Sequence, residues 1–254
     1  MLLNFEGQGD PICLIRDTGE KKAPIISLEK EGEKARFPFD KLHLEAEAPH
    51  FSIIPNPRIE RSVIYITGQS GSGKSYWMAQ YCNEFHKMFP KRSIFLFSSL
   101  AEDKTIDSVK CLKRIKLTPE LMNEDITAED FKDSLVIFDD TDVISDKKMK
   151  AKVNQIMGSI LETGRHWNTY CCVSSHLACA GNDTKRILNE AHKIVIFPAS
   201  IGAGKLKYLL ENYSSLDKDQ QKKLKGIKSR WICINKSYPN VIIAEKDILL
   251  PTAV

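Results

Sequence analysis

The sequence predicts an α/β fold built on a mainly parallel sheet. Five apolar runs rich in β-branched residues follow one another between residues 62 and 199, and stretches of helical character separate them. The runs are continuous rather than alternating, which is typical of strands buried on both faces. Their alternation with helices indicates parallel strands with helices packed against them. The five runs are residues 62–68, 93–99, 134–140, 169–175 and 193–199.

The first 57 residues have a different pattern and are predicted to form a small β-rich annex. Short apolar stretches alternate there with glycine, proline and charged residues, and the segment closes on a Pro-Asn-Pro sequence. We therefore expect an annex over residues 1–57 and a larger domain over residues 58–254. The last apolar runs, residues 230–234 and 240–244, are predicted to extend the sheet as a β-hairpin.

One helix is clearly predicted between the third and fourth runs. Its apolar residues recur at spacings of three and four, which places them on one face that packs against the sheet. Gly164 is predicted to end this helix. The residues of this face are Met149, Val153, Ile156, Met157, Ile160 and Leu161.

Composition and charge exclude several classes of protein. The chain has 254 residues, with 37 basic and 33 acidic side chains and a net charge of +4, which permits a nucleic-acid partner without requiring one. Its seven cysteines contain no C-x-x-C pair, so neither a disulfide framework nor a zinc site is indicated. No apolar run approaches the roughly 18 residues of a membrane span, and the start of the chain lacks the features of a signal peptide. We expect a protein that contacts no membrane and is not exported by a signal peptide.

A phosphate-binding loop follows the first run of the predicted sheet. The sequence GQSGSGKS matches the pattern G-x-x-x-x-G-K-[ST], known as Walker A, and lies between a predicted strand and a predicted helix. Its glycines let backbone N–H groups turn toward phosphates, and the helix N-terminus favours their negative charge. Lys74 is expected to reach the β- and γ-phosphates of ATP, and Ser75 to hold Mg²⁺. The nucleotide-binding residues are Gly68, Gln69, Ser70, Gly71, Ser72, Gly73, Lys74 and Ser75.

Two adjacent carboxylates end the third run, in the arrangement known as Walker B. Ligands bind at the carboxyl ends of parallel strands, so Asp139 and Asp140 are predicted to lie near the phosphates. We expect Asp139 to hold Mg²⁺ through water and Asp140 to polarise the attacking water. The alternative is that Asp139, Asp140 and Asp142 only cap a turn, but the P-loop requires a metal carboxylate.

Three further residues are candidates for the nucleotide site. Arg165 ends the helix before the fourth run, where it could enter a neighbouring subunit's site as an arginine finger. The alternative, that it caps the last carbonyls of its own helix, has equal weight. Ser175 and His176 end the fourth run and could sense the γ-phosphate, although a lone histidine is more often an ordinary surface or core residue.

The order of these motifs resembles the genome-packaging ATPases of large DNA viruses and virophages, the poxvirus-type branch of the FtsK/HerA translocases. The resemblance rests on residues 68–75, 135–140, 164–168 and 229–246. It implies a RecA-like core and a homo-oligomeric ring of roughly five or six subunits with ATP between them. It further implies ATP hydrolysis coupled to sequence-independent pumping of double-stranded DNA into a preformed capsid, with a capsid or portal component as partner. The implied location is the viral factory in the host cytoplasm, or the virion.

The sequence departs from this family in two respects and leaves rival functions open. Relatives often have glutamine where Ser175 or His176 stands, and residues 1–57 match nothing in the family. One rival is a P-loop kinase for nucleosides or small acceptors, although no arginine-rich lid is present. The other is an assembly protein switched by nucleotide. The guanine-selecting N-K-x-D sequence is absent, which disfavours a GTPase.

Lysine clusters are the candidates for contact with DNA phosphates, because such contacts need cations and read no bases. For any single lysine a solvated helix face is the more common explanation. The candidates are Lys147, Lys148, Lys150, Lys152, Lys205, Lys207, Lys222, Lys223, Lys225 and Lys228.

Overall fold

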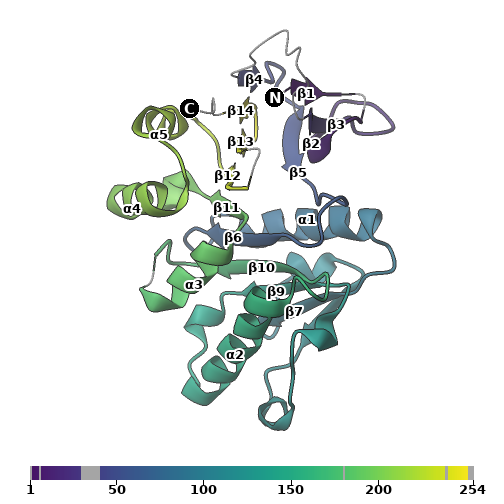
Figure 1. Ribbon diagram of the computed structural model, residues 1–254, viewed down its shortest axis with the longest axis vertical. Helices are drawn as coiled ribbons and strands as arrows, with labels where there is room; N and C mark the ends of the chain where they lie inside the picture. Colours follow the sequence, from purple (N-terminus) through teal and green to yellow (C-terminus); the bar gives the residue numbers. More distant parts are fainter. Residues whose placement is uncertain (1, 6, 30–40, 180, 238–239, 251–254) are drawn as a thin grey trace. The chain divides into compact units, whose positions relative to one another are not determined.

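The chain forms two compact units in a computed structural model that describes residues 2–5, 7–29, 41–179, 181–237 and 240–250 (Figure 1). We call residues 59–192 the P-loop unit, and residues 1–58 together with 193–254 the composite unit. Residues 30–40 of the predicted annex and residues 238–239 of the predicted hairpin lie outside the described residues.

A five-stranded parallel sheet forms the centre of the P-loop unit. Its strands lie in the order β6-β10-β9-β7-β8, and each pairs in parallel with its neighbour. All residues of β6, β9 and β10 are buried, as the continuous apolar runs predicted. The predicted fold class is therefore confirmed. The strands are β6 (Val63–Thr67), β7 (Ile94–Ser98), β8 (Leu112–Ile115), β9 (Leu135–Asp139) and β10 (Tyr170–Ser175).

Three helices accompany this sheet, and the second has the face predicted for it. Every member of that predicted face is buried, and the helix ends at Thr163, directly before Gly164. At its start, the Asp146 carboxylate accepts a hydrogen bond from the Met149 N–H at 2.8 Å, a typical N-cap. The helices are α1 (Lys74–Met88), α2 (Lys147–Thr163) and α3 (Asn182–Glu190), with short 3₁₀ turns η1 (Ile106–Ser108), η2 (Pro119–Asn123), η3 (Glu129–Phe131) and η4 (Thr141–Val143).

The composite unit is built from antiparallel strands. Four of them form a small sheet in the order β1-β3-β2-β5, and five more lie in the order β4-β14-β13-β12-β11. The strands are β1 (Leu2–Asn4), β2 (Asp10–Arg16), β3 (Ile25–Glu29), β4 (Lys41–His43), β5 (His50–Ile53), β11 (Lys193–Ile196), β12 (Ile232–Asn235), β13 (Val241–Ala244) and β14 (Asp247–Leu249). The remaining helices are η5 (Pro198–Ser200), α4 (Ala203–Tyr213) and α5 (Lys218–Lys225).

The N-terminal and C-terminal segments of the chain pair with each other inside the composite unit. Strand β4 of the N-terminal segment pairs with β14 of the C-terminal segment, and the Phe51 N–H donates to the Glu245 carbonyl at 2.9 Å. The predicted boundary after residue 57 places the two paired segments in different domains. The fifth apolar run, predicted as a parallel strand, contains β11, which pairs antiparallel with β12 because the chain returns through α4 and α5. The predicted hairpin appears as β12 and β13.

The described residues contain neither a membrane-spanning helix nor a disulfide bond. None of the described helices is both long enough and apolar enough to cross a bilayer. None of the seven cysteines forms a disulfide bond in the part of the chain that the structure describes, and burial raises the thiol pKa of Cys171 and of Cys233 to about 12. These two thiols therefore stay protonated and pack as small apolar groups.

Candidate functional site

The loop over residues 68–73 connects β6 to α1, as the motif predicted. Its first residue is tied to the neighbouring strand, because the Gly68 N–H donates to the Ser175 carbonyl at 3.3 Å. Gly71 and Gly73 have φ angles of 76° and 107°, a left-handed conformation that glycine adopts without steric cost. Helix α1 then begins at Lys74, and the Trp77 N–H donates to the Gly73 carbonyl at 3.0 Å.

Two features of this loop fit a phosphate group. The first turn of α1 contains no acidic residue, so its free N–H groups and the helix dipole meet no competing negative charge. The Ser72 hydroxyl is buried and has no hydrogen-bond partner among the residues that the structure describes. A buried hydroxyl without a partner is uncommon, and a phosphate oxygen would satisfy it.

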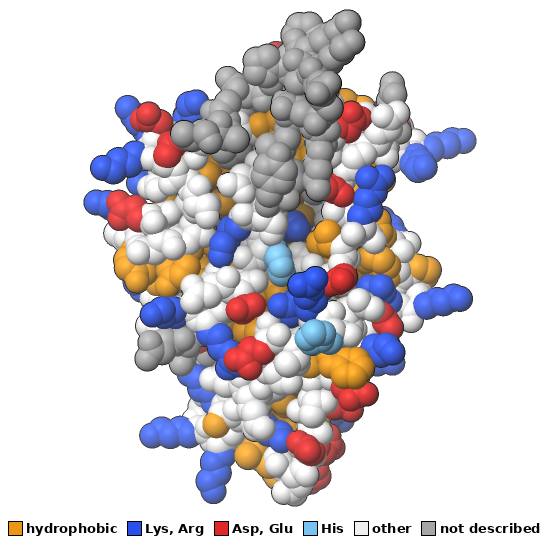
Figure 2. Space-filling view, in the orientation of Figure 1, with side chains coloured by type: hydrophobic (Ala, Val, Ile, Leu, Met, Phe, Trp, Pro, Cys, Tyr) orange, Lys and Arg blue, Asp and Glu red, His pale blue; other side chains and the backbone are white. Residues whose placement is uncertain are grey.

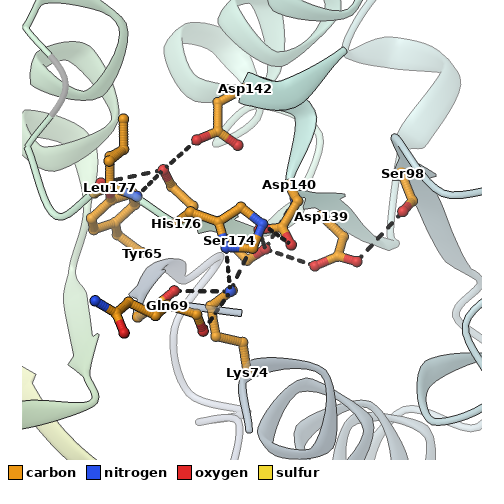
Figure 3. A network of polar contacts seen from close by, with 12 residues as sticks. Tyr65, Gln69, Lys74, Ser98, Asp139, Asp140, Asp142, Ser174, His176 and Leu177 are labelled. Carbon is orange, nitrogen blue, oxygen red and sulfur yellow. Dashed lines mark hydrogen bonds and ion pairs between the residues drawn. The ribbon is translucent and has the colours of Figure 1, made fainter. Parts of the chain in front are cut away.

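Lys74 lies at the centre of a polar network (Figure 3). Its ammonium group donates to the Gly68 carbonyl at 2.9 Å and lies 3.2 Å from His176 Nδ1. It also lies 3.7 Å from Asp140 Oδ1, and its side chain is only 5% exposed. The P-loop lysine is thus joined to the acidic end of β9, which sequence reasoning predicted only as proximity.

Asp139 is the buried member of the predicted acid pair, with 2% of its surface exposed. Its carboxylate accepts hydrogen bonds from the Ser174 hydroxyl at 2.7 Å and from the Ser98 hydroxyl at 3.4 Å. Burial raises the pKa of this carboxyl above its ordinary value, and the nearby Asp140 adds to the increase, while the Ser174 hydrogen bond opposes it. A divalent cation beside Asp139 would favour the ionised form, so the residue suits the predicted Mg²⁺ site together with the half-buried Ser75.

Asp140 differs from its neighbour in both backbone and surroundings. Its φ of 48° and ψ of 37° are left-handed, a conformation that aspartate tolerates better than most residues. Its N–H donates to the Ser174 hydroxyl oxygen at 3.1 Å, and its Oδ2 lies 2.9 Å from His176 Nε2. The left-handed turn aims this carboxylate toward Lys74 and His176 rather than along the strand (Figure 3).

His176 uses both ring nitrogens in this network. The Lys74 ammonium can only donate, so His176 Nδ1 accepts and Nε2 carries the hydrogen that is donated to Asp140. One imidazole therefore connects the phosphate-binding lysine with the predicted general base. Sequence reasoning placed His176 near the nucleotide but missed this bridge, because nothing in a linear sequence shows that residues 74, 140 and 176 meet.

Three serines make contacts in this site that the sequence did not predict. They are Ser98, Ser174 and Ser175. Ser98 and Ser174 hold the acid pair, whereas the Ser175 hydroxyl donates to Asp142 Oδ2 at 2.9 Å. The signal that could have found them is their place at the carboxyl ends of two parallel strands, β7 and β10, which flank β9, because ligands bind at such ends. Asp142 does more than cap a turn, because its side chain is bonded to the neighbouring strand.

Arg165 is not brought to the P-loop of its own chain. Its Nε donates to Glu60 Oε2 at 2.6 Å, and its side chain is 71% exposed. Glu60 precedes β6 and Arg165 precedes β10, so the pair lies at the amino edge of the sheet, opposite the P-loop. The Glu60 carboxylate raises the pKa of the guanidinium above its ordinary value.

The helix-capping alternative for Arg165 is wrong, because another arginine caps α2. Arg61 donates from Nη1 to the Ile160 carbonyl at 2.9 Å and from Nη2 to the Leu161 carbonyl at 3.0 Å. Both carbonyls lie in the last turn of α2, where carbonyls can lack intrahelical partners. The Ile160 carbonyl also accepts from the Gly164 N–H at 2.9 Å. Arg61 therefore caps the end of α2, whereas the Arg165 side chain donates to Glu60.

The candidate lysines are distributed over both units. Lys147, Lys148, Lys150 and Lys152 lie on α2, and the others lie on or near α4 and α5. In the composite unit, Lys223 and Lys228 line a cavity of about 620 Å³. Figure 2 shows lysine and arginine side chains spread over one face and interspersed with acidic ones, rather than gathered in one patch.

Comparison with known proteins places this geometry in context. No protein-family model matches the chain. Over 246 residues, 96% of either chain, the sequence is 46% identical to the uncharacterised protein V3 of Sputnik virophage.

Two solved structures share the fold. The genome packaging NTPase B204 of Sulfolobus turreted icosahedral virus 2, in complex with ATP-gammaS, matches with a TM-score of 0.50 and 14% identity, over 76% of this chain and 99% of that chain. The cytoplasmic domain of the type VII secretion ATPase EccC of Thermomonospora curvata matches with a TM-score of 0.51 and 12% identity, over 81% of this chain and 28% of that chain. These likenesses concern the fold, and they agree with the α/β P-loop architecture that the sequence predicted.

Proposed function

The chain belongs to the family of the Sputnik virophage protein V3, and on this premise we propose that it is a Mg²⁺-dependent ATPase that pumps double-stranded DNA into a viral capsid. One observation carries the proposal. His176 bridges Lys74 of the P-loop and Asp140 of the acidic strand, so the groups that would hold and hydrolyse ATP form one connected network. The fold likeness to a viral genome packaging NTPase, solved with an ATP analogue, supports the same assignment.

The residues of the network divide the work of hydrolysis between them. The loop N–H groups and Lys74 would bind the phosphates, and Ser75 and Asp139 would hold Mg²⁺. When bound, Mg²⁺ neutralises charge on the phosphate oxygens. Asp140 accepts a proton from the attacking water, while the His176 Nε2 hydrogen keeps its carboxylate oriented.

Phosphate binding is expected to change the partners of Lys74. Its ammonium now donates to the Gly68 carbonyl and contacts His176, and a phosphate oxygen would compete for the same hydrogens. His176 would then lose its contact at Nδ1 and keep the one to Asp140. In this way, phosphate binding at the loop would change the contacts of the imidazole that bonds the catalytic carboxylate. This is the sensor role that the sequence predicted for His176 together with Ser175.

Arg165 would act on a neighbouring subunit. Its exposed position at the amino edge of the sheet removes it from its own P-loop and leaves the guanidinium accessible to another copy. In a ring, this edge would face the adjacent nucleotide, where the guanidinium would neutralise charge in the transition state. The proposal therefore includes a homo-oligomeric ring with ATP between subunits, working with a capsid or portal component.

The experiment that tests the function is steady-state phosphate release from Mg-ATP, with and without long double-stranded DNA, at two salt concentrations. Release that DNA stimulates, with stimulation fading as salt rises, is the expected result, because phosphate-backbone contacts weaken with salt. The Lys74→Ala variant is the background control.

Other outcomes would identify a rival. Release that is indifferent to DNA at both salt concentrations contradicts a DNA motor. Transfer of the phosphate to a small acceptor identifies a kinase. Nucleotide-dependent assembly without any release identifies a switch.

A further inference from the structure

We propose that the first turn of α2 contacts the DNA backbone and that Lys150 couples this contact to the nucleotide site, an inference that rests on the proposed function. Four of the first six residues of α2 are lysines, and its first turn contains no acidic residue. The helix begins directly after η4, which follows the catalytic end of β9. In the sequence, only η4 and a short link therefore separate the basic turn from the predicted general base, Asp140.

The charge at this turn is unfavourable for the helix itself. The N-terminus of a helix carries a partial positive charge, so cations there repel it, and acidic residues are the usual occupants. One carboxylate, Asp146, offsets the lysines and is already bonded to the Met149 N–H. A phosphodiester would be attracted both by the lysines and by the helix N-terminus, so it relieves the repulsion that the isolated helix bears.

The four lysines fall into two groups. Lys147 and Lys148 are exposed, and neither forms an ion pair or a side-chain hydrogen bond with any residue in the described ranges. Lys150 donates to the Asp142 carbonyl at 2.8 Å, and Lys152 donates to the Glu124 carbonyl. The first two lysines are available to a partner, while the second two fix the turn to the body of the P-loop unit.

Lys150 ends a short series of hydrogen bonds that begins in the P-loop. The Gly68 N–H donates to the Ser175 carbonyl at 3.3 Å, and the Ser175 hydroxyl donates to Asp142 Oδ2 at 2.9 Å. Asp142 is in turn the residue whose carbonyl accepts from Lys150. Asp142 Oδ1 is buried without a partner among the described residues, so this carboxylate depends on Ser175 for its position.

The chemistry of the surface suits duplex DNA read without regard to sequence. Lysine ammonium groups are point charges that bind phosphates from many directions, and contacts to phosphates carry no base information. A movement of the P-loop on ATP binding or hydrolysis would reach Lys147 and Lys148 through Ser175, Asp142 and Lys150. The turn would then grip and release the backbone in step with the nucleotide.

The contact is tested with the Lys147→Ala/Lys148→Ala variant of the full chain. Its control is Lys91→Ala/Lys132→Ala, which removes the same charge from two exposed lysines before β7 and β9, at the opposite edge of the sheet. DNA affinity is measured against salt concentration with and without ATP-gammaS. Each lost phosphate contact lowers the slope of log K against log salt by about 0.9, so the test variant should lose about 1.8 and the control none. Equal slopes for test variant and control would overturn the proposal.

The coupling is tested with Lys150→Met, whose unbranched side chain is one atom shorter than that of lysine and has no donor. We expect the DNA-stimulated rate at saturating DNA to fall about 3-fold or more while the half-saturating DNA concentration changes little. Lys150→Arg keeps a donor and should restore the stimulation. Unchanged stimulation in Lys150→Met, or a loss that Lys150→Arg does not rescue, contradicts the coupling.

Failure of the proposed function is separable from failure of this inference. Wild-type protein that binds DNA but releases no phosphate removes the ATPase proposal and leaves the affinity test of Lys147 and Lys148 in force. Wild-type protein that binds no DNA overturns both. Stimulated wild-type activity with an unaffected test variant overturns the inference alone.

Discussion

Each edge of the parallel sheet in the P-loop unit has a cation proposed to act on ATP, and the two cations differ in their exposure to solvent. At the carboxyl edge, Lys74 is 5% exposed and is enclosed by carbonyls, an imidazole and a carboxylate. At the amino edge, Arg165 is 71% exposed and pairs with Glu60. The enclosed cation acts inside its own subunit, where burial strengthens each contact. The exposed cation is screened by water and contributes little until another molecule covers it.

The largest expected effect comes from the exposed edge. Arg165→Ala should lower the rate of phosphate release by about 10³-fold, because an arginine finger supplies much of the transition-state neutralisation. Its folding should match wild type, since the side chain has no buried contact. The measurement is kcat in the assembled ring, with Tm as the folding check. Mixed with Lys74→Ala subunits, the variant should regain activity. Complete absence of recovery, or a wild-type rate in Arg165→Ala alone, would count against action in trans.

A smaller loss is expected at the enclosed edge from Asp140→Asn. The amide cannot accept a proton from water, so kcat should fall by about 10²-fold or more while ATP binding is retained. The matched control is Asp133→Asn, the same change at another left-handed aspartate, which lies at the amino end of the same strand. Nucleotide binding and single-turnover hydrolysis are the measurements. Equal rates for the two variants would mean that Asp140 is not the base.

A third prediction concerns stability and pH. The pKa of Asp139 is raised by burial, so between its ordinary and its raised value the folded state binds more protons than the unfolded state. Stability therefore falls as pH rises through that window, and the ionised carboxylate costs stability above it. Asp139→Asn should raise Tm at pH 7 without Mg²⁺, by about 2–4 °C for each kcal/mol relieved, and abolish Mg²⁺-dependent turnover.

The advantage of Asp139→Asn should shrink as the pH falls through the raised pKa toward the ordinary aspartate value of about 3.9, below which the wild-type carboxyl is protonated in both states. Thermal unfolding at several pH values measures this. Asp133→Asn, the same change at a carboxylate that is 46% exposed, is the control for the substitution itself. A lower Tm for Asp139→Asn at pH 7 would mean that its hydrogen bonds outweigh the cost of burial.

The smallest effect is expected from Glu60→Gln. It removes the charge partner of Arg165 from an exposed ion pair, and such pairs contribute little to folding. Tm should not change measurably. In the ring, a freed guanidinium should keep or slightly raise kcat, whereas a large loss would show that Glu60 positions the arginine for its work. Glu211→Gln, which breaks the exposed ion pair of Glu211 with Lys207 on α4, is a control of the same kind.

Much of the P-loop unit could be predicted from the sequence because its signals are local. The continuous apolar runs gave β6, β9 and β10, and the spacing of apolar residues gave the buried face of α2. Strand β8 was not predicted because it is a short edge strand, and two of its four residues are basic. The antiparallel partner of β11 and the pairing of β4 with β14 join segments far apart in the chain, which no local pattern encodes.

The candidate site shows the same limit. The loop and the acid pair could be located from their motifs, but the bridge through His176 depends on three strand ends that become neighbours only in the folded sheet. Likewise, the cap of α2 comes from Arg61, which is far from the helix in sequence, and the sequence offered only the adjacent Arg165 for that role. Residue types could be predicted, whereas their partners required the fold.

The left-handed backbone at Asp140 restricts which amino acids evolution can test at that position. With a φ of 48°, glycine, asparagine and aspartate are accommodated, while longer side chains meet a penalty of about 1–2 kcal/mol before any chemistry is considered. A lineage that replaced this aspartate with glutamate would gain reach toward the attacking water but would have to relax the following turn, η4, as well. The step from one acid to the other is therefore expected to require paired substitutions, and the shorter acid persists as long as the turn does.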